Sequence, residues 1–262
     1  MSNNMIISTA VAPVHREPGF SSEMVTQGLM WESVSLNEEQ DDWQRVQMDD
    51  EYEGWIHNFY LTESSAEFSN SLTITNRYAP VGPQRGKNGI VLAMLSFGTI
   101  VPVLEKTSGY SKIHLLNKNT GFIPPQENVT SQKRDIIIKL AKSLLSVPYL
   151  WGGKSSFGYD CSGFVQMVLK TAGISIARDT GEQIKTEGLE EISINEAQPG
   201  DLIFFSENNR INHVAFSLGN SKIIHCSGEV KIESLIEGES GFSSTLSQLD
   251  HTAVSISKMV EI

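Results

Sequence analysis

The chain has 262 residues, a length that favours two domains or three small ones. Hydrophobic residues make up 39% of it and charged residues 19%, proportions that are typical of a folded globular protein. The formal net charge of −11 argues against a nucleic-acid or anionic-membrane partner, because the chain has no positive surplus to neutralise phosphates.

The N-terminal residues carry no basic stretch followed by a long apolar run, so the sequence predicts no signal peptide. No segment approaches the roughly 18 apolar residues of a membrane span. A cytoplasmic protein is therefore expected, with an exported one as the alternative if the N-terminus has been trimmed. The two cysteines, Cys161 and Cys226, are too few for a disulfide framework. The sequence gives no indication of the oligomeric state.

The first half of the chain contains an internal repeat whose matched positions are shifted by 67 residues, from 46 to 113 and from 54 to 121. The copies read Trp43-x-x-Val46 with Gly54-Trp55-Ile56, and Tyr110-x-x-Ile113 with Gly121-Phe122-Ile123. A run typical of short strands precedes each copy, over 31–36 and 98–103. We therefore predict two small β-barrels, over 1–64 and 65–129, joined near 62–70. The alternative is a generic β meander whose spacing matches by chance.

After Pro124-Pro125 the pattern changes to helices followed by strands. Apolar residues at helical spacing predict a helix over 132–145, which ends before Pro148. A second helix is predicted over 160–172, with Gly173 as its stop signal. The strands predicted after Pro199-Gly200-Asp201 cover 202–205, 214–218, 222–226, 230–235 and 253–259. Helices followed by an antiparallel run indicate an α+β domain over 130–262.

Cys161 is the candidate nucleophile. It stands in Tyr159-Asp160-Cys161-Ser162-Gly163-Phe164, and the apolar stripe of the second predicted helix begins only at Phe164. The thiol is therefore expected in the first helical turn, partly exposed among polar side chains. The partial positive charge of a helix N-terminus lowers the pKa of a thiol and favours the reactive thiolate. The alternative is a small buried residue that only packs, but such a cysteine needs apolar neighbours.

A thiolate that attacks an amide needs a proton shuttle, and histidine is the usual one. His213 and His225 lie on two predicted strands that are joined by a short turn. A three-residue loop would pair Leu218 with Lys222 and place both imidazoles on one face as diagonal neighbours. His213 would then serve Cys161 as base while His225 orients it, whereas a two-residue loop would separate the two rings.

The other cysteine and histidines show weaker patterns. Cys226 follows His225 directly and is expected to face the core as a structural residue. A zinc site built from the two histidines and a cysteine lacks a second close pair of ligands, so no metal or other cofactor is predicted. Solvated surface positions are expected for the other four histidines, His15, His57, His114 and His251.

Taken together, these residues resemble the NlpC-type cell-wall cysteine peptidases, which are papain-like α+β enzymes with Cys-His-His triads. The matching motifs are Pro148-Tyr149-Leu150-Trp151-Gly152-Gly153, Asp160-Cys161-Ser162-Gly163-Phe164, Pro199-Gly200-Asp201-Leu202-Ile203-Phe204-Phe205, His213-Val214-Ala215 and His225. Each motif alone is weak, but five in order over 132–262 are specific. Two preceding SH3-like barrels are similar to the YkfC-like branch of the family. The resemblance implies cleavage between γ-D-glutamate and a diamino acid in murein stem peptides.

The resemblance also implies roles for individual residues. Cys161 would be the nucleophile, His213 the base and His225 the group that orients the base. The implied substrate-binding residues are Tyr149 and Trp151, Asp160 and Ser162 along the D-glutamate site, and Asp179 and Thr180. Tyr149 would lie near the thiolate or the oxyanion, and Asp179 would contact a free substrate amine. Thr180-x-x-Gln183 also fits a plain helix capping box, which leaves a structural alternative for that segment.

In the same branch the first barrel contributes a carboxylate and a tyrosine to the substrate pocket. The matching candidates are Glu23 and Tyr60, with Glu17 as the fallback carboxylate. The substrate would then need a free N-terminal L-Ala, as in the recycling of released stem peptides. Two alternatives stay open: an exported peptidase that remodels intact wall, and a wall-binding protein with an inert C-terminal domain. The sequence does not indicate which diamino acid is preferred.

Overall fold

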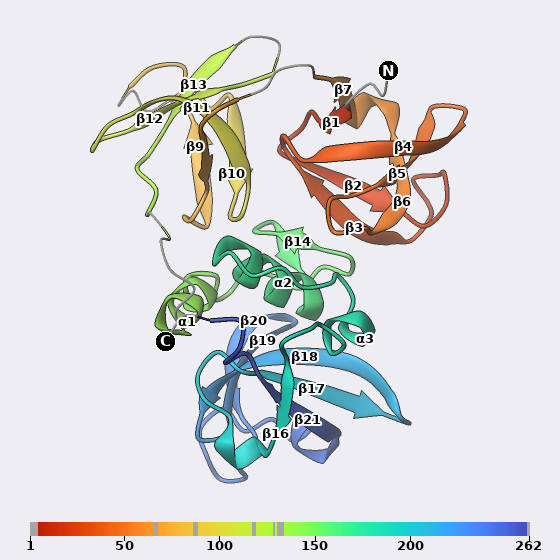
Figure 1. Ribbon diagram of the computed structural model, residues 1–262, viewed down its shortest axis with the longest axis vertical. Helices are drawn as coiled ribbons and strands as arrows, with labels where there is room; N and C mark the ends of the chain where they lie inside the picture. Colours follow the sequence, from red (N-terminus) through yellow and green to blue (C-terminus); the bar gives the residue numbers. More distant parts are fainter. Residues whose placement is uncertain are drawn as a thin grey trace. The chain divides into compact units, whose positions relative to one another are not determined.

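The computed structural model describes residues 5–64, 68–85, 89–116, 119–127, 129 and 134–260. The chain forms two compact units, 1–128 and 129–262, which are described separately (Figure 1). Part of the predicted joint at 62–70 lies outside the described residues, as do the first two residues of the helix predicted from 132. Within the described part of the chain, no helix has the length and apolar character of a membrane span.

The first unit begins with a seven-stranded antiparallel sheet in the order β3-β2-β6-β5-β4-β1-β7. Its elements are β1 (Met5–Ile7), β2 (Val11–His15), β3 (Met24–Leu29), β4 (Ser33–Gln40), β5 (Trp43–Gln47), β6 (Glu53–His57), the 3-10 helix η1 (Asn58–Tyr60) and β7 (Leu61–Glu63). Ile7, Val14, Val46 and Ile56 come from four different strands and are fully buried in one core. The alternating apolar residues of these strands supply that core.

The rest of the first unit has a second core, to which Met30, directly after β3, also belongs. Its strands are β8 (Ser71–Thr73), β9 (Tyr78–Val81), β10 (Ala93–Ser96), β11 (Ile100–Lys106), β12 (Ser111–His114) and β13 (Thr120–Ile123). They form a two-stranded sheet, β10-β9, and a four-stranded sheet, β13-β12-β11-β8. Ile74, Ala79, Val101 and Ile113 are fully buried in this second core.

The 67-residue repeat corresponds to the same hairpin in both places. The repeated cross-strand pairs are Val46–Gly54 between β5 and β6, and Ile113–Gly121 between β12 and β13. A side chain at Gly54 would collide with Val14, and one at Gly121 would collide with Val81, which again is 67 residues further on. Both positions therefore require glycine, because a valine from a neighbouring strand packs against the bare backbone.

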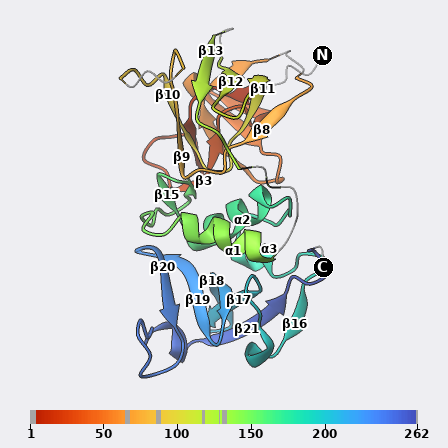
Figure 2. The same cartoon turned by 90° about the vertical axis from the view of Figure 1, so that its left-hand side faces the viewer.

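The second unit places its helices on one side of an antiparallel sheet, as Figures 1 and 2 both show. The helices are α1 (Arg134–Ser143), α2 (Cys161–Thr171) and α3 (Thr180–Gln183). The six strands follow the order β16-β21-β17-β18-β19-β20. They are β16 (Glu190–Ile192), β17 (Leu202–Glu207), β18 (Arg210–Gly219), β19 (Lys222–Ser227), β20 (Glu229–Ser234) and β21 (Asp250–Ser255), while β14 (Lys154–Ser155) and β15 (Gly158–Tyr159) form a separate short hairpin. Two 3-10 helices, η2 (Ile194–Glu196) and η3 (Leu246–Gln248), complete the unit.

The predicted helices and strands of this unit are present. α2 begins one residue after its N-cap, Asp160, and the chain turns away at Gly173, whose φ of 84° is left-handed. The five predicted strands are β17 to β21, and only the last is clearly displaced, because it begins at Asp250 rather than at 253. β16 and the β14–β15 hairpin were not predicted, since they are too short for a clear alternating pattern.

α2 packs on the sheet, and a buried carboxylate ties α1 to the same strands. The ring of Phe164 meets that of Phe216 edge-on, with the centroids 5.8 Å apart. Asp201 is 1% exposed and forms a 2.7 Å ion pair with Arg134. Its carboxylate also accepts backbone hydrogen bonds, including one from Ile256 at 3.0 Å. The charge is satisfied inside the protein, as burial requires.

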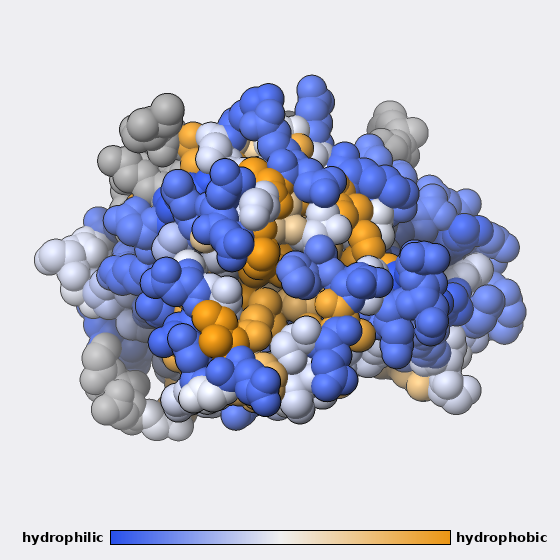
Figure 3. Space-filling model, turned by 90° about the horizontal axis from the view of Figure 1, so that it is seen from below, coloured by the Kyte–Doolittle hydropathy of each residue, from blue (hydrophilic) through white to orange (hydrophobic). Residues whose placement is uncertain are grey.

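The opposite face of the sheet carries a separate apolar core, and 3-10 helices and loops cover it. The buried members of this core are Ala197, Ile203, Phe205, Ala215, Ile223, Leu246 and Ala253, and partly buried Ile192, Ile194, Leu235 and Leu249 pack against them. Seen from below, hydrophobic side chains near the middle of the surface are surrounded by hydrophilic ones (Figure 3).

The turn between β18 and β19 differs from the prediction. It has two residues, Asn220 and Ser221, both with positive φ, and Gly219 rather than Leu218 pairs with Lys222. The three-residue loop was therefore wrong. A β-bulge at Leu218 compensates for the missing loop residue, so that Phe216 lies opposite Ile224 in the register that was expected. The bulge is what keeps both histidines on one face.

The repeated glycines give a testable prediction. Gly54→Ala and Gly121→Ala should each destabilise the first unit by about 2 kcal/mol, because an added methyl group overpacks a fixed valine. Gly109→Ala is the matched control, since nothing lies within 4 Å of its added Cβ. Urea unfolding of the full chain measures the unfolding midpoint of each of the three variants against the wild type. A neutral effect at Gly121 would contradict the structural equivalence of the two hairpins.

Candidate active site

Cys161 is the first residue of α2, and the helix begins there because Asp160 caps it. Asp160 has an extended backbone, and its Oδ1 accepts a hydrogen bond from the Gly163 N–H at 2.6 Å. Cys161 is only 8% exposed, and its thiol accepts a hydrogen bond from the backbone of Val214. The sulfur therefore lies against the strand residue that directly follows His213.

The surroundings of Cys161 keep its thiol protonated. Burial and, next, the negative charge of Asp160 raise the pKa of Cys161 to about 11, although backbone hydrogen bonds and Arg178 act in the opposite direction. The expectations of a partly exposed thiol and a lowered pKa were both wrong. The partial charge of a helix N-terminus is smaller than that of a neighbouring carboxylate, and burial acts in the same direction as the carboxylate.

The strands β18 and β19 separate at the point where the thiol lies. Their regular pairing ends at Phe216–Ile224. Beyond that pair, the Val214 N–H bonds the sulfur of Cys161, and two imidazoles bridge the strands, with Nε2 of His213 2.8 Å from Nδ1 of His225. The two rings stand at 88° to each other. The structure thus brings His213 and His225 together as the sequence suggested.

Both imidazoles are neutral at physiological pH. Burial and, next, the neighbouring His225 lower the pKa of His213 to about 3. Burial also lowers the pKa of His225. The resting site therefore holds a neutral thiol and a neutral imidazole.

Glu233 on β20 is a functional candidate that sequence reasoning missed. Its Oε2 lies 2.9 Å from Nε2 of His225, and its Oε1 lies 2.9 Å from Nζ of Lys231. His225 pairs with Lys231 across β19 and β20, so Glu233 is a diagonal neighbour on the same face. The register argument that joined His213 to His225 would have found Glu233 if it had been extended by one strand.

A buried ion pair holds the first turn of α2. Arg178 donates to Asp160 through Nη2 at 2.6 Å and through Nη1 at 3.0 Å, and Nη1 also reaches Oγ of Ser162 at 2.9 Å. Ser162 donates to the same carboxylate at 3.2 Å. Bidentate pairing satisfies a guanidinium that is almost fully removed from water. Internal bonds therefore occupy the carboxylate of Asp160.

Comparisons with known proteins agree with this geometry. The pattern of the NlpC/P60 family matches residues 146–247, and that of the bacterial dipeptidyl-peptidase SH3 domain matches residues 14–58. The chain is 31% identical over 215 residues to the gamma-D-glutamyl-L-lysine dipeptidyl-peptidase of Bacillus subtilis (strain 168), which covers 76% of this chain and 71% of that protein. The chain belongs to the NlpC/P60 family.

Two further comparisons cover nearly the whole NlpC/P60 chain. Dipeptidyl-peptidase 6 of Lysinibacillus sphaericus is 28% identical over 261 residues, which is 89% of this chain and 92% of that protein. The crystal structure of an NlpC/P60 family protein from Bacillus cereus ATCC 10987 has the same fold, with a TM-score of 0.81 at 21% identity over 95% of this chain and 98% of that one. The predicted cysteine peptidase class, the papain-like domain and an N-terminal SH3-like domain are confirmed.

Two predicted substrate residues of the NlpC/P60 domain lie on the loop before α2. Burial and, next, the charge of Cys161 raise the pKa of Tyr149 to about 12, so its hydroxyl keeps its proton in the neighbourhood of the thiol. The Tyr149 N–H donates to the Gly228 carbonyl at 2.8 Å, which fixes the loop against the sheet. Trp151 is 62% exposed.

The short helix α3 carries the other two predicted substrate residues. Asp179 is exposed and is the N-cap of α3, but its side chain makes no capping hydrogen bond. The capping-box alternative for Thr180 was wrong, because the helix begins at Thr180 itself. Gln183 instead donates to the carbonyls of Ser162 and Ala177, at 3.0 and 2.9 Å, and joins α3 to the first turn of α2.

The three candidates in the first unit lie outside its strands. Glu23 precedes β3 and forms a 2.7 Å ion pair with Arg16. The backbone N–H of Glu17 donates to Oγ of Ser22. Tyr60 ends η1 and packs against the first core. Their predicted role in substrate binding stays a prediction.

The remaining cysteine and histidines are outside this arrangement. Cys226 is fully buried and its thiol donates to the carbonyl of Tyr159 at 3.1 Å. His15 is 6% exposed, so its predicted surface position was wrong: its ring packs edge-on against Trp43 and Phe20. Among the described residues, no group of three or more His, Cys, Asp or Glu side chains is arranged to hold a metal ion.

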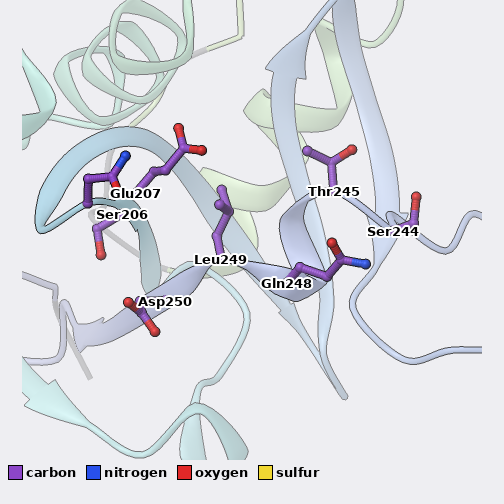
Figure 4. A pocket seen from close by; sticks show the side chains of 8 residues that line it. Ser206, Glu207, Ser244, Thr245, Gln248, Leu249 and Asp250 are labelled. Carbon is purple, nitrogen blue, oxygen red and sulfur yellow. The ribbon is translucent and has the colours of Figure 1, made fainter.

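A polar hollow of about 490 Å³ lies at the far end of β17 and beside η3. Figure 4 shows its lining, which comes from the tip of the β17–β18 hairpin and the segment around η3. The lining residues are Ser206, Glu207, Asn208, Ser244, Thr245, Gln248, Leu249 and Asp250. None of the predicted site residues is among them.

The raised pKa of Cys161 gives a spectroscopic prediction. Because a raised pKa keeps the thiol protonated to higher pH, only about one part in a hundred should be thiolate at pH 9, two units below a pKa of about 11. The difference in ultraviolet absorbance between wild type and Cys161→Ala measures the thiolate fraction of Cys161. The absorbance of the tyrosines, which both proteins share, cancels in this difference. Half-ionisation of Cys161 near pH 9 or below would contradict the prediction.

The different burial of the two thiols gives a labelling prediction. One equivalent of iodoacetamide should modify Cys161 before Cys226, because Cys226 is 0% exposed and burial raises its pKa still further. Peptide mapping by mass spectrometry identifies the labelled residue. Labelling of Cys226 first would show that Cys161 is not the accessible nucleophile.

Proposed function

We propose that this NlpC/P60 peptidase hydrolyses the bond between γ-D-glutamate and the diamino acid of murein stem peptides. The observation that carries the proposal is the thiol of Cys161 at a capped helix N-terminus, against the strand that holds His213, with His225 bonded to Nε2 of that imidazole. The names of the Bacillus subtilis and Bacillus cereus relatives, gamma-D-glutamyl-L-lysine dipeptidyl-peptidase, support the substrate class.

The proposed reaction is acyl transfer. Nε2 of His213 is engaged with His225, which leaves Nδ1 to take the proton from Cys161 as the sulfur attacks the γ-carbonyl of D-glutamate. The backbone N–H of Cys161 and the protonated hydroxyl of Tyr149 stabilise the oxyanion. His213 then protonates the departing amine of the diamino acid. Water, deprotonated by His213, hydrolyses the thioester and releases L-Ala-γ-D-Glu.

The proposed substrate is a stem peptide with a free N-terminal L-Ala, as expected for a recycling enzyme. Three relatives are named dipeptidyl-peptidases, which supports release of a dipeptide from a free N-terminus. A buried ammonium group needs carboxylate partners. Asp179, which is exposed at the start of α3, and Glu23, with Tyr60 as a hydrogen-bond partner, are proposed for that role.

The proposed domain organisation has three parts, 1–64, 65–129 and 130–262. An SH3-like identity for the second part is supported by the repeat, because Val81 packs on Gly121 as Val14 packs on Gly54. A cytoplasmic location belongs to the same proposal.

The proposed catalytic roles predict that substitutions of these residues lower the activity to different extents. Cys161→Ala and His213→Ala should each lower kcat by at least about a thousandfold on L-Ala-γ-D-Glu-L-Lys or its meso-diaminopimelate equivalent. His225→Gln should retain part of the activity, because its amide oxygen can still accept from His213. Product mass spectrometry measures the rates. The control is His251→Ala, an exposed histidine on the same sheet, which should stay within about twofold. A wild-type rate in His213→Ala would place the base elsewhere.

The free-amine requirement predicts discrimination against blocked substrates. N-acetylation of L-Ala should lower kcat/KM by at least about a hundredfold, or about 3 kcal/mol, because it removes the charge and leaves buried acceptors unpaired. Asp179→Ala and Glu23→Ala should each reduce the difference in kcat/KM between the free and the N-acetylated peptide. Neither substitution should change the rate at which Cys161 is labelled. Equal rates on both peptides, or clearing of intact sacculi, would favour an exported wall-remodelling enzyme instead.

A further inference from the structure

The hydrogen-bonded row that begins at His213 continues beyond His225 to a carboxylate. Nε2 of His213 lies 2.8 Å from Nδ1 of His225, and Nε2 of His225 lies 2.9 Å from Oε2 of Glu233. The three side chains come from three consecutive strands, β18, β19 and β20. His225 is 0% exposed and both of its ring nitrogens are engaged, so the row is continuous inside the protein.

A carboxylate at the end of the row fixes the position of every proton in it. An ionised carboxylate only accepts hydrogen bonds, so Nε2 of His225 must carry a proton. A neutral imidazole has one N–H, and Nδ1 of His225 must then accept from Nε2 of His213. The only proton of neutral His213 is thereby placed on Nε2. Its Nδ1 keeps the lone pair that a base for Cys161 needs.

Other side chains hold Glu233 in its ionised form. Burial alone would raise its pKa, but a hydrogen bond from Lys231, the interaction with His225 and a hydrogen bond from Ser243 outweigh burial and lower it. The Lys231 contact uses Oε1, which leaves Oε2 for the imidazole. The charged groups that act on His225 are Glu233 and Lys231, both from β20. Glu233 therefore keeps its charge at the pH at which both imidazoles are neutral.

We infer that Glu233 is a positioning residue of this peptidase, which sets the tautomer of His225 and, through it, that of His213. It extends the Cys161–His213–His225 arrangement by one member that touches neither the thiol nor the substrate. Its effect on turnover rests on the proposed function, whereas its effect on the protons of the free enzyme does not. The two effects can be measured separately.

Replacement of Glu233 by glutamine is the decisive change. It keeps the size of the side chain, but its amide can donate a hydrogen bond whereas the carboxylate can only accept one. The amide of Glu233→Gln can rotate and donate to Nε2 of His225, which moves the His225 proton to Nδ1 and the His213 proton to Nδ1 as well. That tautomer has no lone pair directed at Cys161. Glu229→Gln is the matched control, since Glu229 is an exposed carboxylate on the same strand and pairs with Ser227.

The first measurement is the tautomeric state of the histidines by nitrogen-15 NMR of the full chain, assigned with His213→Ala and His225→Gln. In the wild type, both His213 and His225 should be protonated at Nε2 and unprotonated at Nδ1. Glu233→Gln should shift both rings towards Nδ1–H, and Glu229→Gln should not. A wild-type His225 protonated at Nδ1 would overturn the inference even if Glu233→Gln failed to fold.

The second measurement is turnover of the stem peptide. Glu233→Gln should lower kcat about tenfold to a hundredfold with little change in KM, the range found when the group that orients a functional histidine is lost. Glu229→Gln should stay within about twofold. A lower kcat without a change of tautomer would overturn the positioning role. If the wild type shows the expected tautomers but does not cleave the peptide, the proposed function fails and the inference about Glu233 stands.

Discussion

Two short hydrogen bonds join the carboxylate of Asp160 to the guanidinium of Arg178, where both groups are almost completely removed from solvent. The same carboxylate caps α2 at Gly163 and accepts from Ser162. Removing either member would leave an unpaired buried charge, which costs several kcal/mol. The first turn of α2 is therefore fixed in position, and with it the backbone of Cys161. The segment that leads into α3 is fixed by the same contacts, because Arg178 belongs to it.

This arrangement has a chemical consequence. The negative charge of Asp160, which orders the start of the helix, lies beside Cys161 and, with burial, keeps its thiol protonated. A neutral thiol is a weak nucleophile, so the proposed reaction needs proton transfer to His213 during attack rather than a preformed thiolate. In the proposed mechanism His213 is the base for that transfer. The row of hydrogen bonds from His213 through His225 to Glu233 is what we infer to set its tautomer.

The two parts of the first unit show how a sequence repeat is maintained by packing. Gly54 and Gly121 occur at equivalent places because Val14 and Val81 lie against their backbones. The two cores of the first unit follow from the alternating apolar residues of the short strands, and Met30, directly after β3, also belongs to the second core.

The sequence by itself determined the class of the second unit, the position of α2 and the identities of Cys161, His213 and His225 as candidates. Helical spacing, a capping aspartate and alternating strands are local patterns, and each reports a local preference of the backbone. The internal repeat was visible for the same reason, because identical residue types recur at one fixed interval.

Only the tertiary structure decided the charge state of the thiol, the register of the histidine hairpin and the contact between Glu233 and His225. The pKa of Cys161 depends on burial and on how close Asp160 lies, and neither quantity is local in the sequence. A bulge at Leu218 restored the register that a two-residue turn would have shifted, and the sequence alone did not determine the length of that turn. Arg178 and His15 were not singled out as buried polar groups for the same reason. Their partners come from distant segments, and only the folded chain brings them within hydrogen-bond or ring-packing distance.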